Sequence, residues 1–139
     1  MSHRESFGLL EADMQGRPLV ANIDLSLSTF AEQAAFPWFL SLSTQLKEAT
    51  SQGLPTDSEA NALNTWEDEV EALLRSVVAY KYVGRVTWNG HRELLFQIAE
   101  PRPAAETLQR LIDGRKTRPF AFRCEYDDSW SHVSGYLAA

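Results

Sequence analysis

Apolar and polar side chains alternate on both sides of Asn89-Gly90, between Tyr80 and Ala99. Alternation with a period of two predicts β-strands, because successive side chains of a strand point to opposite faces. Asn-Gly between two such runs favours a type I′ turn, whose two central residues both need a positive φ. The sequence therefore predicts a hairpin, and the paired residues on one of its faces are Trp88 with His91, Val86 with Glu93, Gly84 with Leu95 and Tyr82 with Gln97.

The two faces of this predicted hairpin differ in character. The face with the better aliphatic block is assigned to the core, and it holds Val83, Leu94, Phe96 and Ile98. The opposite face is unusually aromatic for a surface in contact with water, and it holds Tyr82, Val86, Trp88 and Leu95. Such a face is either covered by another part of the chain or offered to a partner.

The same alternation predicts strands elsewhere in the chain. Residues 7–14 and 19–27 flank the turn signal Gln15-Gly16-Arg17-Pro18, so they predict an opening hairpin. A third strand is expected over residues 38–46, and a last strand over residues 119–126. Each run places hydrophobic residues at every second position, as a strand with one buried face requires.

Two stretches have apolar residues three or four positions apart, which is typical of amphipathic helices. The clearer one begins after Thr56, with Glu59 three residues on as in a capping box, and runs to Val77. The second covers residues 104–113, with Gly114 as its C-terminal cap. The acidic residues of the first helix are interpreted as a solvated face rather than a binding cluster, and they are Glu59, Glu67, Asp68, Glu69 and Glu71.

The order of these elements predicts the fold class. From the third strand onwards it reads strand, helix, strand, strand, helix, strand, which is the ferredoxin-like split βαβ order of an α+β protein. Such a fold has an antiparallel sheet with both helices on one face. We expect one domain over residues 1–139, with the opening hairpin at 7–27, the core at 37–126 and a tail at 127–139 that holds a short helix. The opening hairpin either extends the sheet at an edge or crosses its other face.

Composition limits the function classes. A net charge of -6 and a pI near 5.0 weigh against nucleic acid as the main ligand, because phosphate contacts need clustered Lys and Arg. No apolar run is long enough to span a bilayer, and the N-terminus lacks the apolar core of a signal peptide. We therefore expect a soluble cytoplasmic protein.

No motif for catalysis stands out. There is no Gly-x-Ser-x-Gly elbow, and the single cysteine, Cys124, lacks an evident His partner and is interpreted as a buried hydrophobe. The histidines are scattered along the chain, so we expect no metal site. We also expect no cofactor and no catalytic residue. One constellation remains at the hairpin tip, where His91, Arg92 and Glu93 face Trp88. It is either an acid-base site or ordinary cross-strand pairing at the surface.

Several short signatures, in this order, resemble an uncharacterised bacterial family known as domain of unknown function 695. They are Phe36-Pro37, Gly53-Leu54-Pro55, Leu63 with Glu67-Asp68, Val83-Gly84 through Thr87, Gly90, Arg92-Glu93 and Asp127-x-x-Trp130. Phe36 stands where the family usually has Tyr, and Leu95-Phe96 stands where an aromatic pair is expected. The resemblance implies no catalytic residues. It implies an occasional link to a domain similar to a regulator of ribonuclease E, itself a small acidic protein that binds an enzyme.

The leading hypothesis from the sequence is a non-catalytic module with a binding or regulatory role, acting through a protein partner. Aromatic residues and Arg are the usual anchors of such interfaces. The expected surface combines Tyr82, Trp88 and Leu95, with His91, Arg92 and Glu93 around it.

Three further hypotheses stay open at this point. One is a small enzyme or small-molecule-binding protein, with a pocket at the sheet face or a dimer interface and with His91, Glu93 and Asp127 as its polar groups. Another is weak RNA binding through the basic residues from Arg115 to Arg123. Finally, edge pairing between two copies is common in open sheets, so a homodimer is also a hypothesis.

Overall fold

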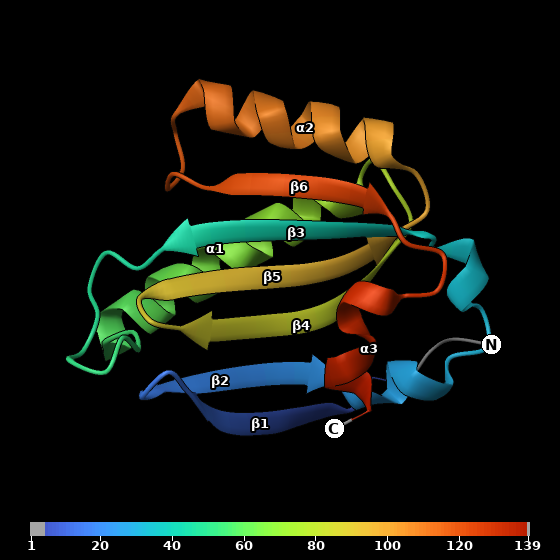
Figure 1. Cartoon of the computed structure of the whole chain (residues 1–139). Coiled ribbons are helices and arrows are strands. Elements are labelled where there is room, and N and C mark those ends of the chain that lie inside the picture. Colours follow the sequence, from blue (N-terminus) through green and yellow to red (C-terminus); the bar gives the residue numbers. More distant parts are fainter. Residues whose placement is uncertain (1–4, 139) are drawn as a thin grey trace.

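The computed structural model describes residues 5–138, which form a mixed α+β structure (Figure 1). The strands are β1 (Phe7–Met14), β2 (Arg17–Asp24), β3 (Trp38–Gln45), β4 (Tyr80–Trp88), β5 (His91–Ile98) and β6 (Ala121–Tyr126). The helices are α1 (Asp57–Arg75), α2 (Pro101–Gly114) and α3 (Ser131–Leu137), and two short 3-10 helices are η1 (Leu25–Thr29) and η2 (Gln33–Ala35). Among the described residues, no helix has the length and apolar character needed to cross a membrane.

The strands form one antiparallel sheet in the order β1-β2-β4-β5-β3-β6. The opening hairpin therefore extends the sheet beside β4, and does not cross its face. Its second strand ends at Asp24 rather than at Leu27 as predicted. The reason is local, because the Asp24 carboxylate accepts a hydrogen bond from the N–H of Ser26 (3.2 Å) and starts the 3-10 turn η1.

One face of the sheet, here called the α1 face, packs against α1 and α2. As predicted, the Thr56 hydroxyl caps α1 by accepting a hydrogen bond from the N–H of Glu59 (3.3 Å). The prediction for α2 needs two corrections. This helix begins at Pro101, which suits the first turn because Pro has no N–H to satisfy there, and the left-handed residue at its C-terminus is Arg115 (φ 53°) rather than Gly114. The buried residues of this layer include Leu40, Leu42, Leu63, Trp66, Val70, Leu94, Phe96 and Leu108.

The opposite face, here called the α3 face, is covered in part by α3 and η1 (Figure 1). The short helix predicted in the tail is present, and the Asp127 carboxylate accepts hydrogen bonds from the N–H groups of Ser131 (2.8 Å) and His132 (3.0 Å) at its start. Trp130 is fully buried beneath it. The second core that results includes Ile23, Leu27, Phe39, Val83, Val86, Leu95, Trp130 and Val133.

The central hairpin follows the predicted register from its tip as far as Gly84 opposite Leu95, and then departs from it. A β-bulge leaves Val83 without a partner, so Tyr82 lies opposite Phe96 instead of Gln97. Gly84 is required at this place, since a Cβ there would lie 2.2 Å from the backbone oxygen of Asn22 on β2. A one-residue shift reverses the face of each side chain beyond it. Tyr82 therefore points to the α1 face, and Val83, which the pattern assigned to the core beside Phe96, belongs to the core under α3.

Candidate functional site

The α3 face is covered by α3 and η1 only in part. Figure 1 shows α3 in front of the right half of the sheet, whereas no helix of the described residues lies in front of the half near the β4–β5 turn. Ser43, which lies on β3 in the interior of the sheet, is exposed here. An exposed side chain on an interior strand is the sign of a bare sheet face. We call this area the open half, and its residues are Ser43, Trp88, His91, Glu93, Ala121 and Arg123.

A hollow of about 320 Å³ lies in the open half, next to the hairpin tip. Trp88 and Glu93 are half-buried in its wall, and His91 is exposed at its rim. The Trp88 indole Nε1 donates a hydrogen bond to the backbone oxygen of Met14 (3.0 Å), which fixes the ring against the opening hairpin. Tyr136 reaches the hollow from α3. The site thus combines two aromatic side chains with a carboxylate and an imidazole.

Glu93 is held in place from the neighbouring strand. The hydroxyl of Ser41, opposite the hairpin on β3, donates a hydrogen bond of 2.5 Å to Glu93 Oε2. Burial, and secondarily the Glu93 charge, raises the pKa of the Tyr136 phenol, which therefore stays protonated at neutral pH. The arrangement offers a fixed acceptor and a phenol donor to a bound molecule.

The structure brings together only some of the residues proposed from the sequence. Trp88, His91 and Glu93 share the open half. Leu95 is on the same face but 2% exposed, because α3 covers it. Tyr82 lies on the α1 face, where its hydroxyl donates a hydrogen bond to Glu67 (3.2 Å).

Arg92 also lies on the α1 face, because neighbouring residues of a strand point to opposite sides. Its Nη1 contacts Glu67 Oε2 at 2.9 Å, and both side chains are 7% exposed. Arg92 therefore lies on the other side of the sheet from Trp88, His91 and Glu93, and pairs with Glu67. Desolvation by burial lowers the pKa of the Arg92 guanidinium from its ordinary value, although the Glu67 charge opposes this.

The prediction of a solvated acidic helix face holds for Asp68 and Glu69, which are exposed, but is wrong for Glu59 and Glu67. Glu59 and Glu67 are buried, and each holds an arginine, Arg118 and Arg92 respectively. Their spacing contains a signal for this, because both lie four residues from the buried Leu63 and so share its side of the helix. A buried carboxylate needs a cationic partner, so this spacing also predicts a buried arginine for each.

His91, Glu93 and Asp127, the polar groups proposed for a catalytic pocket, are not together. His91 pairs with Gln45 at one end of β3, whereas Tyr126, next to Asp127, pairs with Trp38 at the other end. These ends are seven residue steps apart along the strand, which is about 23 Å at 3.3 Å per step. Among residues 5–138, no three His, Cys, Asp or Glu side chains lie in a metal-binding group.

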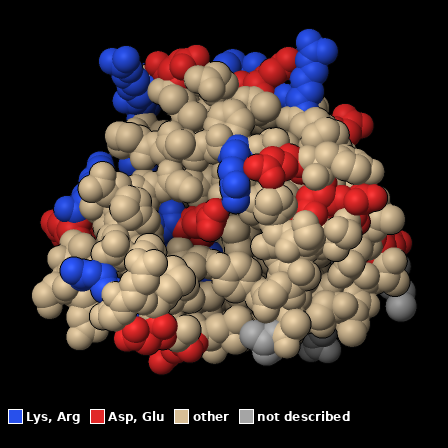
Figure 2. Space-filling view, viewed as in Figure 1, with Lys and Arg blue, Asp and Glu red and all other residues tan. Residues whose placement is uncertain are grey.

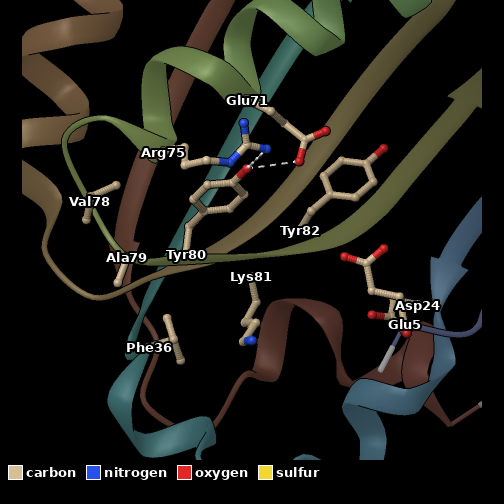
Figure 3. A pocket seen from close by; sticks show the side chains of 10 residues that line it. All are labelled: Glu5, Asp24, Phe36, Glu71, Arg75, Val78, Ala79, Tyr80, Lys81 and Tyr82. Carbon is tan, nitrogen blue, oxygen red and sulfur yellow. Dashed lines mark hydrogen bonds between the residues drawn. The ribbon is translucent and has the colours of Figure 1, made fainter. Parts of the chain in front are cut away.

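A second hollow, of about 510 Å³, lies where β4 continues past the end of β2 (Figure 3). Glu71 and Arg75 of α1 reach it from one side, and Tyr80 lies between them. The Tyr80 hydroxyl donates a hydrogen bond to Glu71 (3.1 Å) and accepts one from Arg75 (3.3 Å). Lys81 points away from α1, and its Nζ lies 4.7 Å from the centre of the Phe30 ring.

Burial shifts the pKa values of two groups in this second hollow, Glu71 and Tyr80. Desolvation raises the pKa of the Glu71 carboxyl, although hydrogen bonding from Tyr80 opposes it. Desolvation, followed by the charge of Glu71, raises the pKa of Tyr80 to about 12. A carboxyl with a raised pKa in a hollow is a feature of binding and catalytic sites.

The basic residues after α2 do not form one patch. Arg118 is buried against Glu59, whereas Arg123 lies over the Phe39 ring on the α3 face at 5.5 Å. Figure 2 shows acidic and basic side chains scattered over the face that α3 covers, without a broad basic area. The Cys124 thiol is half-buried, and desolvation raises its pKa to about 11, so little thiolate is present at neutral pH.

Comparison with known proteins gives one match. A family model described as a family of unknown function, DUF695, matches residues 8–138. No curated protein and no solved structure was found to match the chain. The matched span runs from the first strand to the end of α3, so it contains the sheet, both cores and both hollows. The chain therefore belongs to the DUF695 family, whose function is unknown.

Proposed function

We propose that this chain is a non-catalytic protein-binding module with a regulatory role, and that it contacts its partner through the open half of the α3 face. The observation that carries the proposal is the half-covered sheet. One half of the face is sealed by α3, which buries Val83, Val86 and Leu95, and the other half stays open. The open half keeps the half-buried Trp88 ring among polar side chains, so it offers an aromatic anchor on which a partner packs.

The residues of the open half suit a protein interface. Trp88 is a half-buried aromatic side chain whose indole N–H is already bonded to Met14, so binding a partner costs little further side-chain entropy. Ser41 similarly holds Glu93 in one position. Interfaces take most of their binding energy from such central aromatic residues, surrounded by polar ones.

Replacing Trp88 with Ala is expected to weaken partner binding about 30-fold, the loss of a typical aromatic anchor worth about 2 kcal/mol. The measurement is affinity capture by the tagged chain from a lysate of its own host, followed by titration of the captured protein. Duplicates treated with nuclease separate protein contacts from contacts through RNA.

Tyr126→Ala is the matched control, because Tyr126 is 62% exposed, lies on β6 and belongs to the opposite face. Circular dichroism establishes that each variant is folded. The proposal fails if the Trp88 variant and the Tyr126 variant retain the partner equally well.

A second candidate function, binding of a small molecule, is supported by the hollow beside Tyr80. Its wall combines carboxylates with Arg75 and Lys81, so it presents both signs of charge to a polar ligand. In this hypothesis Glu71 contacts the ligand, and we expect Glu71→Gln to abolish any ligand-induced rise in melting temperature.

A thermal-shift screen of metabolites and metal ions tests this candidate, since a ligand that binds only the folded state must raise the melting temperature. Glu69→Gln is the control, because Glu69 is an exposed acid on the same helix outside the hollow. An unchanged shift in the Glu71 variant would rule this hollow out.

We further propose that β3, α1, β4, β5, α2 and β6 form a ferredoxin-like unit to which the opening hairpin is added. The strand order β4-β5-β3-β6 and the antiparallel pairing of neighbours support this assignment. The open half then lies on the sheet face opposite the two helices of that unit.

A further inference from the structure

The edge strand β1 has only part of the usual protection of a sheet edge. It lies at the margin of the sheet, and no further strand or helix among residues 5–138 lies beside it (Figure 1). It is eight residues long and carries the charged residues Glu11 and Asp13, but it contains no Pro or Lys, two residues that commonly block edge pairing. Three of the five exposed large hydrophobic residues among residues 5–138 belong to it, namely Phe7, Leu9 and Met14.

The register of the hairpin shows which backbone groups of β1 are free to pair outwards. Its turn has two residues, Gln15 and Gly16, so the flanking pair Met14 and Arg17 is a hydrogen-bonded pair. Hydrogen-bonded pairs alternate along an antiparallel ladder. The even-numbered residues of β1 therefore bond to β2, and the N–H and C=O groups of Phe7, Leu9, Glu11 and Asp13 point away from the sheet.

We propose that two copies of this chain pair through their β1 strands, antiparallel about a two-fold axis at Leu10. In this register Leu10 faces Leu10 of the second copy. Leu9 faces Glu11, and Phe7 faces Asp13, so every outward-pointing residue from 7 to 13 pairs with another. The two sheets then form one continuous sheet.

Charge and overlap favour this register over its neighbours. A two-fold axis at Glu11 would place each Glu11 opposite its own copy, and like charges directly opposite destabilise a strand pair. An axis at Leu9 would leave residues 12–14 unpaired. Only the axis at Leu10 pairs residues 7–13 and places each acidic residue opposite an apolar one.

The register makes opposite predictions for two substitutions of the same leucine. Leu9→Glu places a carboxylate opposite Glu11 of the second copy, twice in each dimer, and should weaken dimerisation about tenfold. Leu9→Lys removes the same apolar contact but places an ammonium opposite that Glu11, so the dimer should persist. Leu9 is 59% exposed, so neither change disturbs the core of the monomer.

Sedimentation equilibrium of the full chain over about 1–200 µM measures the dissociation constant for each variant. The expected result is a dimer for the wild type and Leu9→Lys, and a tenfold weaker dimer for Leu9→Glu. Tyr126→Glu, on the other edge strand, is the control and should dimerise like the wild type. A wild type that is monomeric throughout overturns the proposal. So do equal losses in the two Leu9 variants, or a dimer that Tyr126→Glu dissociates.

Discussion

Replacing Arg118 with Met is expected to lower the free energy of unfolding by about 3–5 kcal/mol, because it leaves a buried carboxylate without its cation. Arg118 Nη2 lies 2.9 Å from Glu59 Oε2, and the two side chains are 5% and 3% exposed. Arg118 also donates a hydrogen bond from Nε to the Thr44 hydroxyl (3.1 Å), so one side chain joins α1 to β3. Urea unfolding at neutral pH measures the loss.

A double variant tests the mechanism. Replacing both Glu59 and Arg118 with Met removes the charges together, and such replacement of a buried pair is often close to neutral. We therefore expect the double variant to recover much of the stability that Arg118→Met loses. A double variant less stable than the single one would show that the loss comes from packing or from Thr44, and would contradict this account.

The same pair predicts a pH dependence with a definite sign. The hydrogen bond from Arg118 lowers the pKa of Glu59 below its ordinary value of 4.5, although burial opposes it. A group with a lowered pKa in the folded state stabilises the protein above its unfolded pKa, and that stability is lost as pH falls through the folded pKa. The wild type should therefore lose stability below about pH 4.5, and the difference between wild type and Arg118→Met should shrink there.

Replacing Trp130 with Ala is expected to cost about 3–5 kcal/mol of unfolding free energy, as large-to-small changes of a buried aromatic residue do. Trp130 is 1% exposed and packs in the second core, between α3 and the sheet. Its indole Nε1 donates to the backbone oxygens of Gln33 (3.1 Å) and Phe36 (3.0 Å), which ties the connection before β3 to the tail. Removing the ring leaves both a cavity and two carbonyls with one donor fewer.

Two comparison variants separate these contributions. Trp130→Phe keeps most of the ring volume but cannot donate the hydrogen bonds, so about 1–2 kcal/mol of loss is expected. Trp88→Ala removes a half-exposed ring and should also cost less than Trp130→Ala. Urea unfolding followed by far-ultraviolet circular dichroism measures all three, and equal losses for Trp130→Ala and Trp88→Ala would contradict the assignment of α3 as a covering element.

Local pattern was enough for most secondary structure. Alternation predicted the strands, helical spacing and Thr56 predicted α1, and Asn89-Gly90 predicted the central turn, where Asn89 and Gly90 have φ values of 50° and 81°. These features depend on neighbours within a few residues, so short stretches of sequence are enough to predict them. The family followed from short signatures, and the family model confirms it.

The candidate site was only half predictable from the sequence. Trp88, His91 and Glu93 meet because they lie within four residues of one turn, where the register holds. The bulge at Val83 moves Tyr82 to the opposite face of the sheet. The alternation of apolar and polar residues does not show where a strand takes an extra residue. Alternation alone puts Arg92 on the face opposite His91 and Glu93, whereas its partner there, Glu67, comes from a helix that the hairpin pattern does not contain.

By itself, the sequence determined the helices and strands, their order, the register next to the turn and the family, because each of these depends on residues close together in the chain. Tertiary structure alone decided which surfaces stay open. Periodicity shows which side chains share a face, but the element that covers the face comes from elsewhere. Here α3 covers one part of the sheet face and leaves the other bare, while the opening hairpin places β1 at the edge of the sheet. These two surfaces are where the proposed contacts lie.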